Sequence, residues 1–284
     1  MLDNNKGVTI FEKLYEKLYT EQEPLHFDVD IWAIANSPEF GRHDVEKVLS
    51  TMRSGFSPGL DQVTREMLKF ADENTLDILA TAFNHRFEGA NDDSWSPVLV
   101  TLIPNTSTAN KVGAYRPISL LSTSYKAYEL LLVTLMPQNI QSKMDEFHFW
   151  FRKSYQALAN ISTARLIAEK ALEKGKSLVE CKTDVAKAFD TLSHNTIIDS
   201  LGFYGVEDSV IFAIIRETRG NSMMLRTPDG HMTKHIKQSR GVRQGGTISP
   251  LLFVLALSFI LHDLIADLER WGMGFTDAAS AICA

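Results

Sequence analysis

The chain has 284 residues, 44% of them apolar, and a formal net charge of −6. These values are ordinary for a globular protein with a sizeable core, and the polar N-terminus excludes a secretory signal. The longest apolar run, 251–261, is well short of the ~20 residues that a membrane helix needs. Cys181 and Cys283 fit no metal-ligand spacing and are expected to be reduced thiols in an intracellular protein.

Charge is distributed unevenly along the chain. Residues 1–100 carry 9 Lys and Arg against 18 Asp and Glu, whereas the remainder carries 20 against 17. Six basic residues between positions 219 and 243 face only Asp229 in opposite sign. Such a stripe can bind phosphate even on an acidic protein, although a solvated hairpin surface explains it equally well.

The first hundred residues predict mainly helices. Residues 7–50 read as helices with acidic loops, and 57–61 form a turn before a helix through Val63 and Phe70. The helical pattern continues from Leu76 to Phe87, and 98–103 is a strand closed by Pro104.

The middle of the chain predicts a helix followed by a strand. Arg116 to Leu121 leads into a helix, and Ser162 or Thr163 caps another that ends at Gly175. Residues 178–185 then alternate between polar and apolar side chains. This alternation predicts a strand of a sheet with one open face, to which Asp184 points.

Two helices, divided at Gly202 and Gly205, precede a predicted hairpin. Its strands are 222–226 and 232–238, joined by a turn at 227–230. Ser249 is an N-cap, with Pro250 at the first helical position of a long apolar helix. Helices combined with an antiparallel sheet make the expected fold class α+β.

Asp184 is the candidate catalytic residue and metal ligand. A strand-end carboxylate, with the Val185 carbonyl one residue on, suits hard Mg²⁺, which lowers the pKa of a primer hydroxyl and clamps a triphosphate. Phe189 lies where an aromatic ring could stack under an incoming sugar and exclude a 2′-hydroxyl. The alternatives without a catalytic role are that Asp184 is an ordinary surface aspartate and Phe189 an ordinary core phenylalanine.

The segment 240–253 is the strongest motif in the chain. Its glycines, Gly241 and Gly245 among them, give backbone N–H groups room to approach a ligand. Gln244 offers a donor and an acceptor for a base edge, and Arg243 offers a phosphate contact. Arg116 and Lys111, in and beside a constrained loop, are candidates to grip a triphosphate, or else form an exposed basic loop.

Five motifs in order resemble the reverse transcriptases of LINE-type (non-LTR) retrotransposons, and more loosely the group II intron and retron enzymes. They are 57–61, 102–104, 116–121, 184–190 and 241–253. The resemblance runs from about residue 45 to residue 265 and implies a right-hand polymerase. Its regions are a helical lead (1–44), a fingers-like region (45–176) and a palm-like region (177–284).

The resemblance also implies roles for individual residues. Asp184 matches the first catalytic aspartate, and Val185 matches the residue that lends its carbonyl to the metal. The positions that match nucleotide-binding residues are Lys111, Arg116, Phe189, Gln244 and Gly245, and those that match template-binding residues are Gly241, Arg243 and Arg152. The implied metal is Mg²⁺, with Mn²⁺ as the alternative.

The sequence departs from the family pattern at two important places. Trp150 precedes Phe151 and Arg152 where the family has glycine. The family's paired aspartates are missing, and Asp277 is the nearest substitute. One carboxylate cannot hold two Mg²⁺ ions for in-line displacement. We therefore expect this chain to be an inactive fragment, without thumb and endonuclease modules.

The resemblance implies an RNA template, a DNA primer and deoxynucleoside triphosphates as partners, no membrane, and a location in the nucleus and cytoplasm. Two other functions remain open. One is a catalytically dead remnant that binds RNA, which a salt-dependent affinity without nucleotide incorporation would favour. The other is a group II intron-like maturase, which a basic C-terminal extension would favour.

Overall fold

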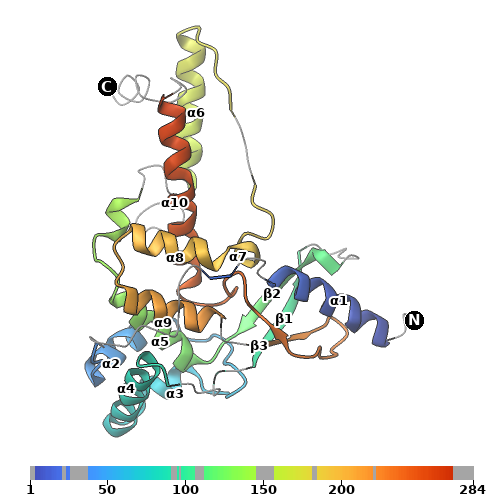
Figure 1. Ribbon diagram of the computed structural model, residues 1–284, viewed down its shortest axis with the longest axis vertical. Helices are drawn as coiled ribbons and strands as arrows, with labels where there is room; N and C mark the ends of the chain where they lie inside the picture. The colour runs from blue at the N-terminus through green and yellow to red at the C-terminus, as the bar shows by residue number, and fades with distance from the viewer. Residues whose placement is uncertain are drawn as a thin grey trace.

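The computed structural model describes most of the chain, in the ranges 4–20, 24–25, 38–90, 95, 97–105, 112–144, 157–180, 184–219 and 222–270. Helices dominate these ranges, and one small sheet lies at one side of the molecule (Figure 1). The α-helices are α1 (Asn4–Tyr19), α2 (Arg42–Thr51), α3 (Arg65–Lys69), α4 (Glu73–Phe87), α5 (Thr123–Thr134), α6 (Ala157–Glu173), α7 (Ala188–Thr191), α8 (His194–Phe203), α9 (Asp208–Arg219) and α10 (Ser249–Arg270). Two 3₁₀ helices are η2 (Val112–Ala114) and η3 (Ile140–Lys143).

The sheet has four strands in the order β2-β1-β3-β4. They are β1 (Val98–Pro104), β2 (Tyr115–Leu120), β3 (Ser222–Arg226) and β4 (Ile236–Lys237). β1 pairs antiparallel with β2, and β3 pairs antiparallel with β4. The combination of helices and this sheet confirms the α+β class.

The expectation of a wholly antiparallel sheet is wrong, because its central pair is parallel. Val98 lies opposite Met223, and Thr101 lies opposite Arg226. A parallel pair needs a long crossover between its strands. Here α5, α6, α8 and α9 all lie between β1 and β3 in the chain, so this connection is long enough.

The buried side chains form two clusters that meet at α5. The larger cluster lies among α2, α4, α5, α8, α9 and α10, and includes Phe83, Tyr128 and Leu255. The smaller one lies between α1 and the sheet, and includes Tyr15, Tyr19 and Val100. Trp95 packs against both clusters. The N-terminal helix is therefore part of the core beside the sheet, as Figure 1 shows.

Several local signals in the sequence are confirmed. The 227–230 turn closes through a hydrogen bond of 2.9 Å from the Gly230 N–H to the Thr227 carbonyl. Gly175 ends α6 with a φ of 60°, and α10 starts at Ser249. The cap predicted at Ser162 or Thr163 is wrong, because α6 already starts at Ala157.

The strand predicted at 178–185 is wrong within the described residues. Residues 178–180 and 184–185 belong to no strand. Val179 is 92% exposed and Val185 is 50% exposed, so the alternating pattern has no buried face. A strand needs a neighbour for its backbone groups, and the order β2-β1-β3-β4 includes no segment from this region.

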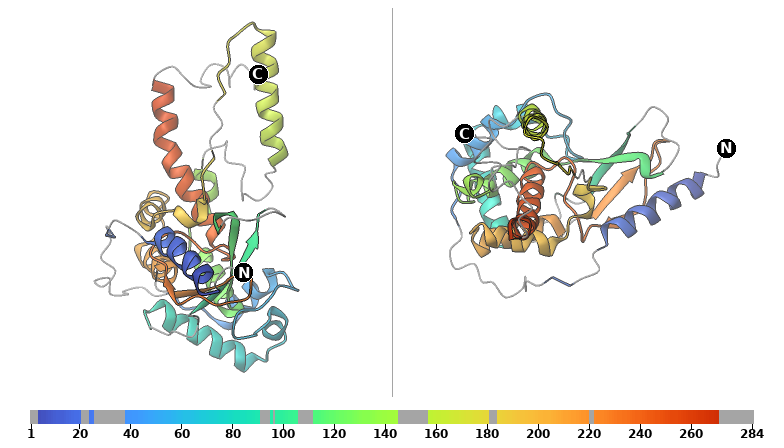
Figure 2. Two further views of the ribbon diagram at one scale, coloured as in Figure 1. Left: turned by 90° about the vertical axis from the view of Figure 1, so that its right-hand side faces the viewer. Right: turned by 90° about the horizontal axis from the view of Figure 1, so that it is seen from above.

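The helices α6 and α10 extend furthest from the body of the molecule. They overlap in Figure 1, but the side view in Figure 2 shows them apart. The N-terminal half of α10 is buried in the larger cluster, whereas Ile260 and Leu264 further along are exposed. Among the described residues, no helix combines the length and apolarity required to cross a membrane.

Candidate functional site around the glycine-rich loop

The glycines of the 240–247 loop pack against neighbouring backbone. A Cβ atom built on Gly241 would lie 2.5 Å from the Asp190 carbonyl oxygen, and one on Gly245 would lie 2.5 Å from the Ser119 carbonyl oxygen. Both glycines also have positive φ angles, 80° and 126°. Glycine is required here because both the conformation and the close approach exclude a side chain.

Backbone N–H groups of this loop donate hydrogen bonds to carbonyl groups of the protein. Gly241 donates to the Leu192 carbonyl over 2.8 Å, and Val242 donates to the Phe189 carbonyl over 2.7 Å. The Gln244 carbonyl accepts a bond of 2.7 Å from the Ser119 N–H. The expectation that the glycines free N–H groups for a ligand is therefore corrected for Gly241: the loop uses its N–H to hold the turn that follows Asp184.

Asp190 joins this turn to the loop through its side chain. It is 2% exposed, and its Oδ2 accepts a bond of 3.2 Å from Gln244 Nε2. Its Oδ1 accepts a bond of 3.0 Å from the Tyr19 hydroxyl. Burial raises the pKa of Asp190, although these bonds and nearby Lys187 oppose the shift.

Buried His194, at the start of α8, supports the same loop. Its Nε2 lies 2.9 Å from the Gly241 carbonyl oxygen. Asp190 and His194 thus orient the loop and the helix start.

Glu129 on α5 holds the far end of the loop. This side chain is 3% exposed, and its Oε2 accepts bonds from the Thr247 N–H at 2.6 Å and the Thr247 hydroxyl at 2.9 Å. Thr247 lies just before the start of α10, where a negative charge interacts favourably with the helix dipole. Burial nevertheless raises the pKa of Glu129. No pattern in the sequence predicted a role for Glu129.

Asp184 and Val185 are both exposed and precede the turn at 186–191. An exposed carboxylate fits one ligand position of a hard cation such as Mg²⁺. Among the described residues, however, no three His, Cys, Asp or Glu side chains are grouped to hold a metal. These residues alone therefore do not form a two-metal site, and no catalytic step through Mg²⁺ follows from them.

Phe189 is partly buried and stacks on Phe253 of α10, with 5.2 Å between the ring centroids. This contact fixes the ring beside the start of α10. It agrees with the structural alternative of a packed phenylalanine. A role in sugar selection remains a prediction for the part of the ring that is still accessible.

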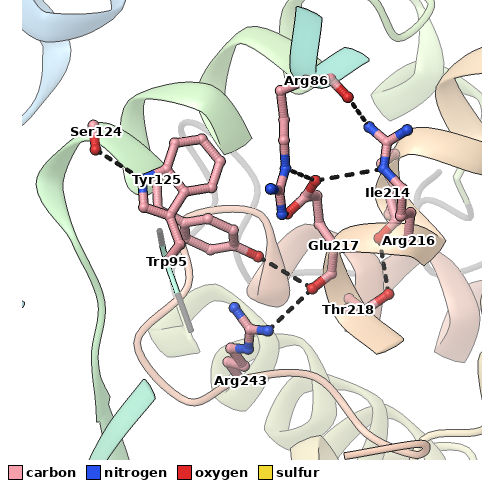
Figure 3. A network of polar contacts seen from close by, with 9 residues as sticks. All are labelled: Arg86, Trp95, Ser124, Tyr125, Ile214, Arg216, Glu217, Thr218 and Arg243. Atoms are coloured by element: carbon pink, nitrogen blue, oxygen red, sulfur yellow. Dashed lines mark hydrogen bonds and ion pairs between the residues drawn. The ribbon is translucent and has the colours of Figure 1, made fainter. Parts of the chain in front are cut away.

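Arg243 points into the protein. It is 4% exposed, its guanidinium donates to the Glu217 carbonyl over 3.1 Å, and it lies 5.1 Å from the Tyr125 ring centroid. Figure 3 shows the side chain within a buried network. The expectation that Arg243 offers a surface contact to the template is therefore corrected: the residue secures the loop to α5 and α9.

The centre of this network is the ion pair between Arg86 and Glu217 (Figure 3). Arg86 Nε and one terminal nitrogen lie 2.8 and 3.0 Å from the two Glu217 carboxylate oxygens. Arg216 also donates to the Arg86 carbonyl. The pair connects α4 with α9, and no local pattern predicts it because the two residues lie far apart in the chain.

The remaining predicted site residues are less well placed. Arg116 is exposed on β2, opposite Ile103 of β1. Lys111, Arg152 and Asp277 lie outside the described residues. The predicted basic stripe divides, because Arg226, Lys234 and Lys237 are exposed whereas Arg240 donates to the Thr191 carbonyl.

A cavity of about 640 Å³ adjoins the glycine-rich loop. It lies between residues 51–57, α5 and residues 245–250, and its walls include Arg53, Phe56 and Lys126. Phe56 is 64% exposed. Burial lowers the pKa of Lys126, and nearby Glu129 opposes this shift. Cationic and aromatic groups around an open cavity suit a ligand with phosphates and planar rings.

Comparison with known proteins identifies relatives of most of the chain. Residues 103–277 match the family "Reverse transcriptase (RNA-dependent DNA polymerase)". A retrovirus-related Pol polyprotein from a type-2 retrotransposable element of Drosophila melanogaster is 29% identical over 63% of this chain and 17% of its own length. A Pol polyprotein from a type-1 element of Popillia japonica is 27% identical over 68% and 26%, respectively. The chain thus spans about a quarter or less of the length of these relatives.

Proposed function

Since the chain belongs to the reverse transcriptase (RNA-dependent DNA polymerase) family, we propose that it forms the fingers and palm of a non-LTR retroelement polymerase. Its substrates would be an RNA template, a DNA primer and deoxynucleoside triphosphates. In this proposal, residues 1–44 are a helical lead, 45–176 the fingers and 177–284 the palm. Thumb and endonuclease modules would belong to a longer element protein.

The observation that carries this proposal is the junction between the two strongest motifs. The turn after Asp184 and the glycine-rich loop are joined by the Asp190–Gln244 hydrogen bond and by the bond from the Val242 N–H to the Phe189 carbonyl. A nucleotide that contacts both Phe189 and Gln244 would therefore meet groups whose relative positions are fixed. Such preorganisation favours a binding site over two unrelated surface motifs.

The family resemblance supplies the remaining roles. Asp184 and the Val185 carbonyl would hold Mg²⁺, with Asp277 as a further candidate ligand. Lys111 and Arg116 would contact the triphosphate, Phe189 the sugar, Gln244 and Gly245 the base pair, and Arg152 the template. Mg²⁺, when bound, would lower the pKa of the primer hydroxyl and neutralise phosphate charge.

We also propose that the 284-residue chain does not itself extend a primer. A second metal-holding carboxylate is required for in-line displacement, and the described residues near Asp184 provide no metal-binding cluster. The test is extension of a DNA primer on an RNA template with Mg²⁺, comparing the wild type with Asp184→Ala. Extension that Asp184→Ala abolishes would refute the proposed inactivity and support the polymerase assignment.

A second candidate function is binding of RNA or an RNA–DNA hybrid without chemistry. The cavity beside Gly245 favours it, because Arg53 and Lys126 offer positive charge and Phe56 offers an exposed ring. Hybrid affinity should fall with salt, and each lost phosphate contact should reduce the slope of log K against log salt by about 1. Arg53→Gln should cause this reduction.

The matched control is Arg165→Gln, which removes an arginine from exposed α6, away from the cavity. It should leave the slope unchanged. Equal effects of both substitutions would indicate non-specific charge attraction and would contradict a site at the cavity. No hybrid affinity in the wild type would contradict both candidate functions.

A further inference from the structure

The side-chain amide of Gln244 has a defined orientation. Its Nε2 lies 3.2 Å from Asp190 Oδ2. Asp190 Oδ2 accepts this bond, so the NH₂ group of Gln244 faces Asp190. The side-chain oxygen of Gln244, Oε1, then faces away from Asp190. Because Gln244 remains partly exposed, this oxygen is oriented to accept a hydrogen bond from a ligand beside the loop.

The other oxygen of Asp190 depends on the N-terminal helix. The Tyr19 hydroxyl donates to Oδ1 over 3.0 Å, and Tyr19 is 3% exposed. The Tyr19 carbonyl in turn accepts bonds from the Ser239 N–H at 2.9 Å and the Ser239 hydroxyl at 3.0 Å. The end of α1 is thus attached both to Asp190 and to the segment that leads into the glycine-rich loop.

We propose that Asp190 is a positioning residue that orients the Gln244 amide, and that α1 controls this orientation through Tyr19. The inference rests on the proposed function, in which Gln244 meets the base pair of the incoming nucleotide. The contact of Gln244 with the base pair would thus depend on α1, although α1 contributes no group to that base pair. Removing the Tyr19 hydroxyl leaves Asp190 free to turn, and the Gln244 amide loses its fixed direction.

Substitution of Asp190 by asparagine has a sharper consequence. Tyr19 can still donate to the asparagine oxygen, which leaves the asparagine NH₂ facing Gln244. Two NH₂ groups cannot bond to each other, so as long as Tyr19 donates to the asparagine oxygen, the Gln244 amide turns over and directs its NH₂ outward. The loop would then offer a donor where the wild type offers an acceptor.

Nuclear magnetic resonance of the free protein, labelled with ¹⁵N-glutamine, tests the orientation. The Gln244 side-chain signals are assigned by their loss in Gln244→Leu. They should shift in Asp190→Asn and in Tyr19→Phe. Unchanged signals in folded forms of these variants would overturn the proposal. Tyr19→Phe removes one oxygen atom only, so it decides the question even if Asp190→Asn does not fold.

Tyr15→Phe is the matched control. Tyr15 lies one turn earlier on α1, is fully buried, and stacks on Tyr19 with 5.7 Å between the ring centroids. Among the described residues its hydroxyl has no hydrogen-bond partner. Its removal should leave the Gln244 signals in place. A shift as large as that of Tyr19→Phe would overturn the specific role of the Tyr19 hydroxyl.

Affinity for a fluorescent RNA–DNA primer–template then tests the functional consequence. Loss of one net hydrogen bond predicts a roughly fivefold weaker complex in Tyr19→Phe and Asp190→Asn, with no change in Tyr15→Phe. Shifted Gln244 signals with wild-type affinity would overturn the positioning role. If the wild type binds no primer–template, the proposed function fails, whereas the resonance experiment still decides whether Asp190 and Tyr19 orient Gln244.

Discussion

Thr247 donates both its backbone N–H and its hydroxyl to one carboxylate oxygen of Glu129, so α5 fixes the loop residue that precedes α10. Glu129→Ala would leave both donors without this acceptor in a buried site, which should lower the free energy of unfolding by about 3 kcal/mol. Glu129→Gln keeps an oxygen that can accept both bonds and should cost only about 1 kcal/mol, because the carboxylate charge and its second oxygen are lost. Urea denaturation measures both, and equal losses would contradict the role of this oxygen as the acceptor for Thr247.

The same carboxyl group predicts a pH dependence. Burial raises the pKa of Glu129 above the ordinary value of 4.5. The stability that this group contributes is therefore fully present below 4.5 and is lost as the pH rises through the higher folded-state pKa. Glu129→Gln lacks this titration. Its deficit relative to the wild type should shrink as the pH rises through this window, and a deficit that grows with pH would contradict the raised pKa.

Gly241 and Gly230 have nearly equal φ angles, so alanine substitutions at the two positions distinguish the cost of conformational strain from the cost of overpacking. Gly241 and Gly230 have φ angles of 80° and 88°, but only Gly241 has atoms within 4 Å of an added Cβ. Gly230→Ala should cost about 1 kcal/mol, from the left-handed conformation alone. Gly241→Ala adds overpacking against Asp190 and should cost at least about 3 kcal/mol. Thermal unfolding of both variants gives the comparison, in which similar losses would argue against the close contact.

The buried ion pair has an exposed counterpart of identical length. Arg86–Glu217 and Arg165–Glu169 both have Nε to Oε1 distances of 2.8 Å, but the arginine side chains are 11% and 80% exposed, respectively. Arg86→Met removes the two short contacts of a buried carboxylate and leaves it the longer 3.7 Å contact with Arg216, so it should cost about 3 kcal/mol, whereas Arg165→Met should cost less than about 0.5 kcal/mol. Chemical denaturation checks both values. A small loss in Arg86→Met would mean that Arg216 or water compensates the Glu217 charge.

Local sequence signals predicted much of the fold correctly. Ser249 and Pro250 indicated the start of α10, residues 227–230 the hairpin turn, and Gly175 the end of α6. These features depend on backbone preferences of a few adjacent residues, so the local sequence determines them. The prediction of a strand at 178–185 was wrong because an alternating pattern alone does not supply a neighbouring strand.

The interior of the candidate site was harder to predict. Glycines and Arg243 suggested contacts to a ligand, but Gly241 meets Asp190 and Arg243 meets Glu217 inside the protein. In the sequence, Glu129 is an ordinary polar residue of a predicted helix, and its role follows only from the contact between α5 and Thr247. Such roles depend on contacts between distant segments, which no local pattern encodes.

The parallel pairing of β1 with β3 has a consequence for biosynthesis. As the ribosome releases the chain, β1 and β2 are available early, but the partner for the other side of β1 is made only after α9. Until then, β1 is an edge strand with unpaired backbone groups and a row of apolar side chains, Val98, Val100 and Leu102, that are buried in the finished fold. Synthesis of this chain therefore includes an interval of exposure to aggregation, which ends when β3 has emerged.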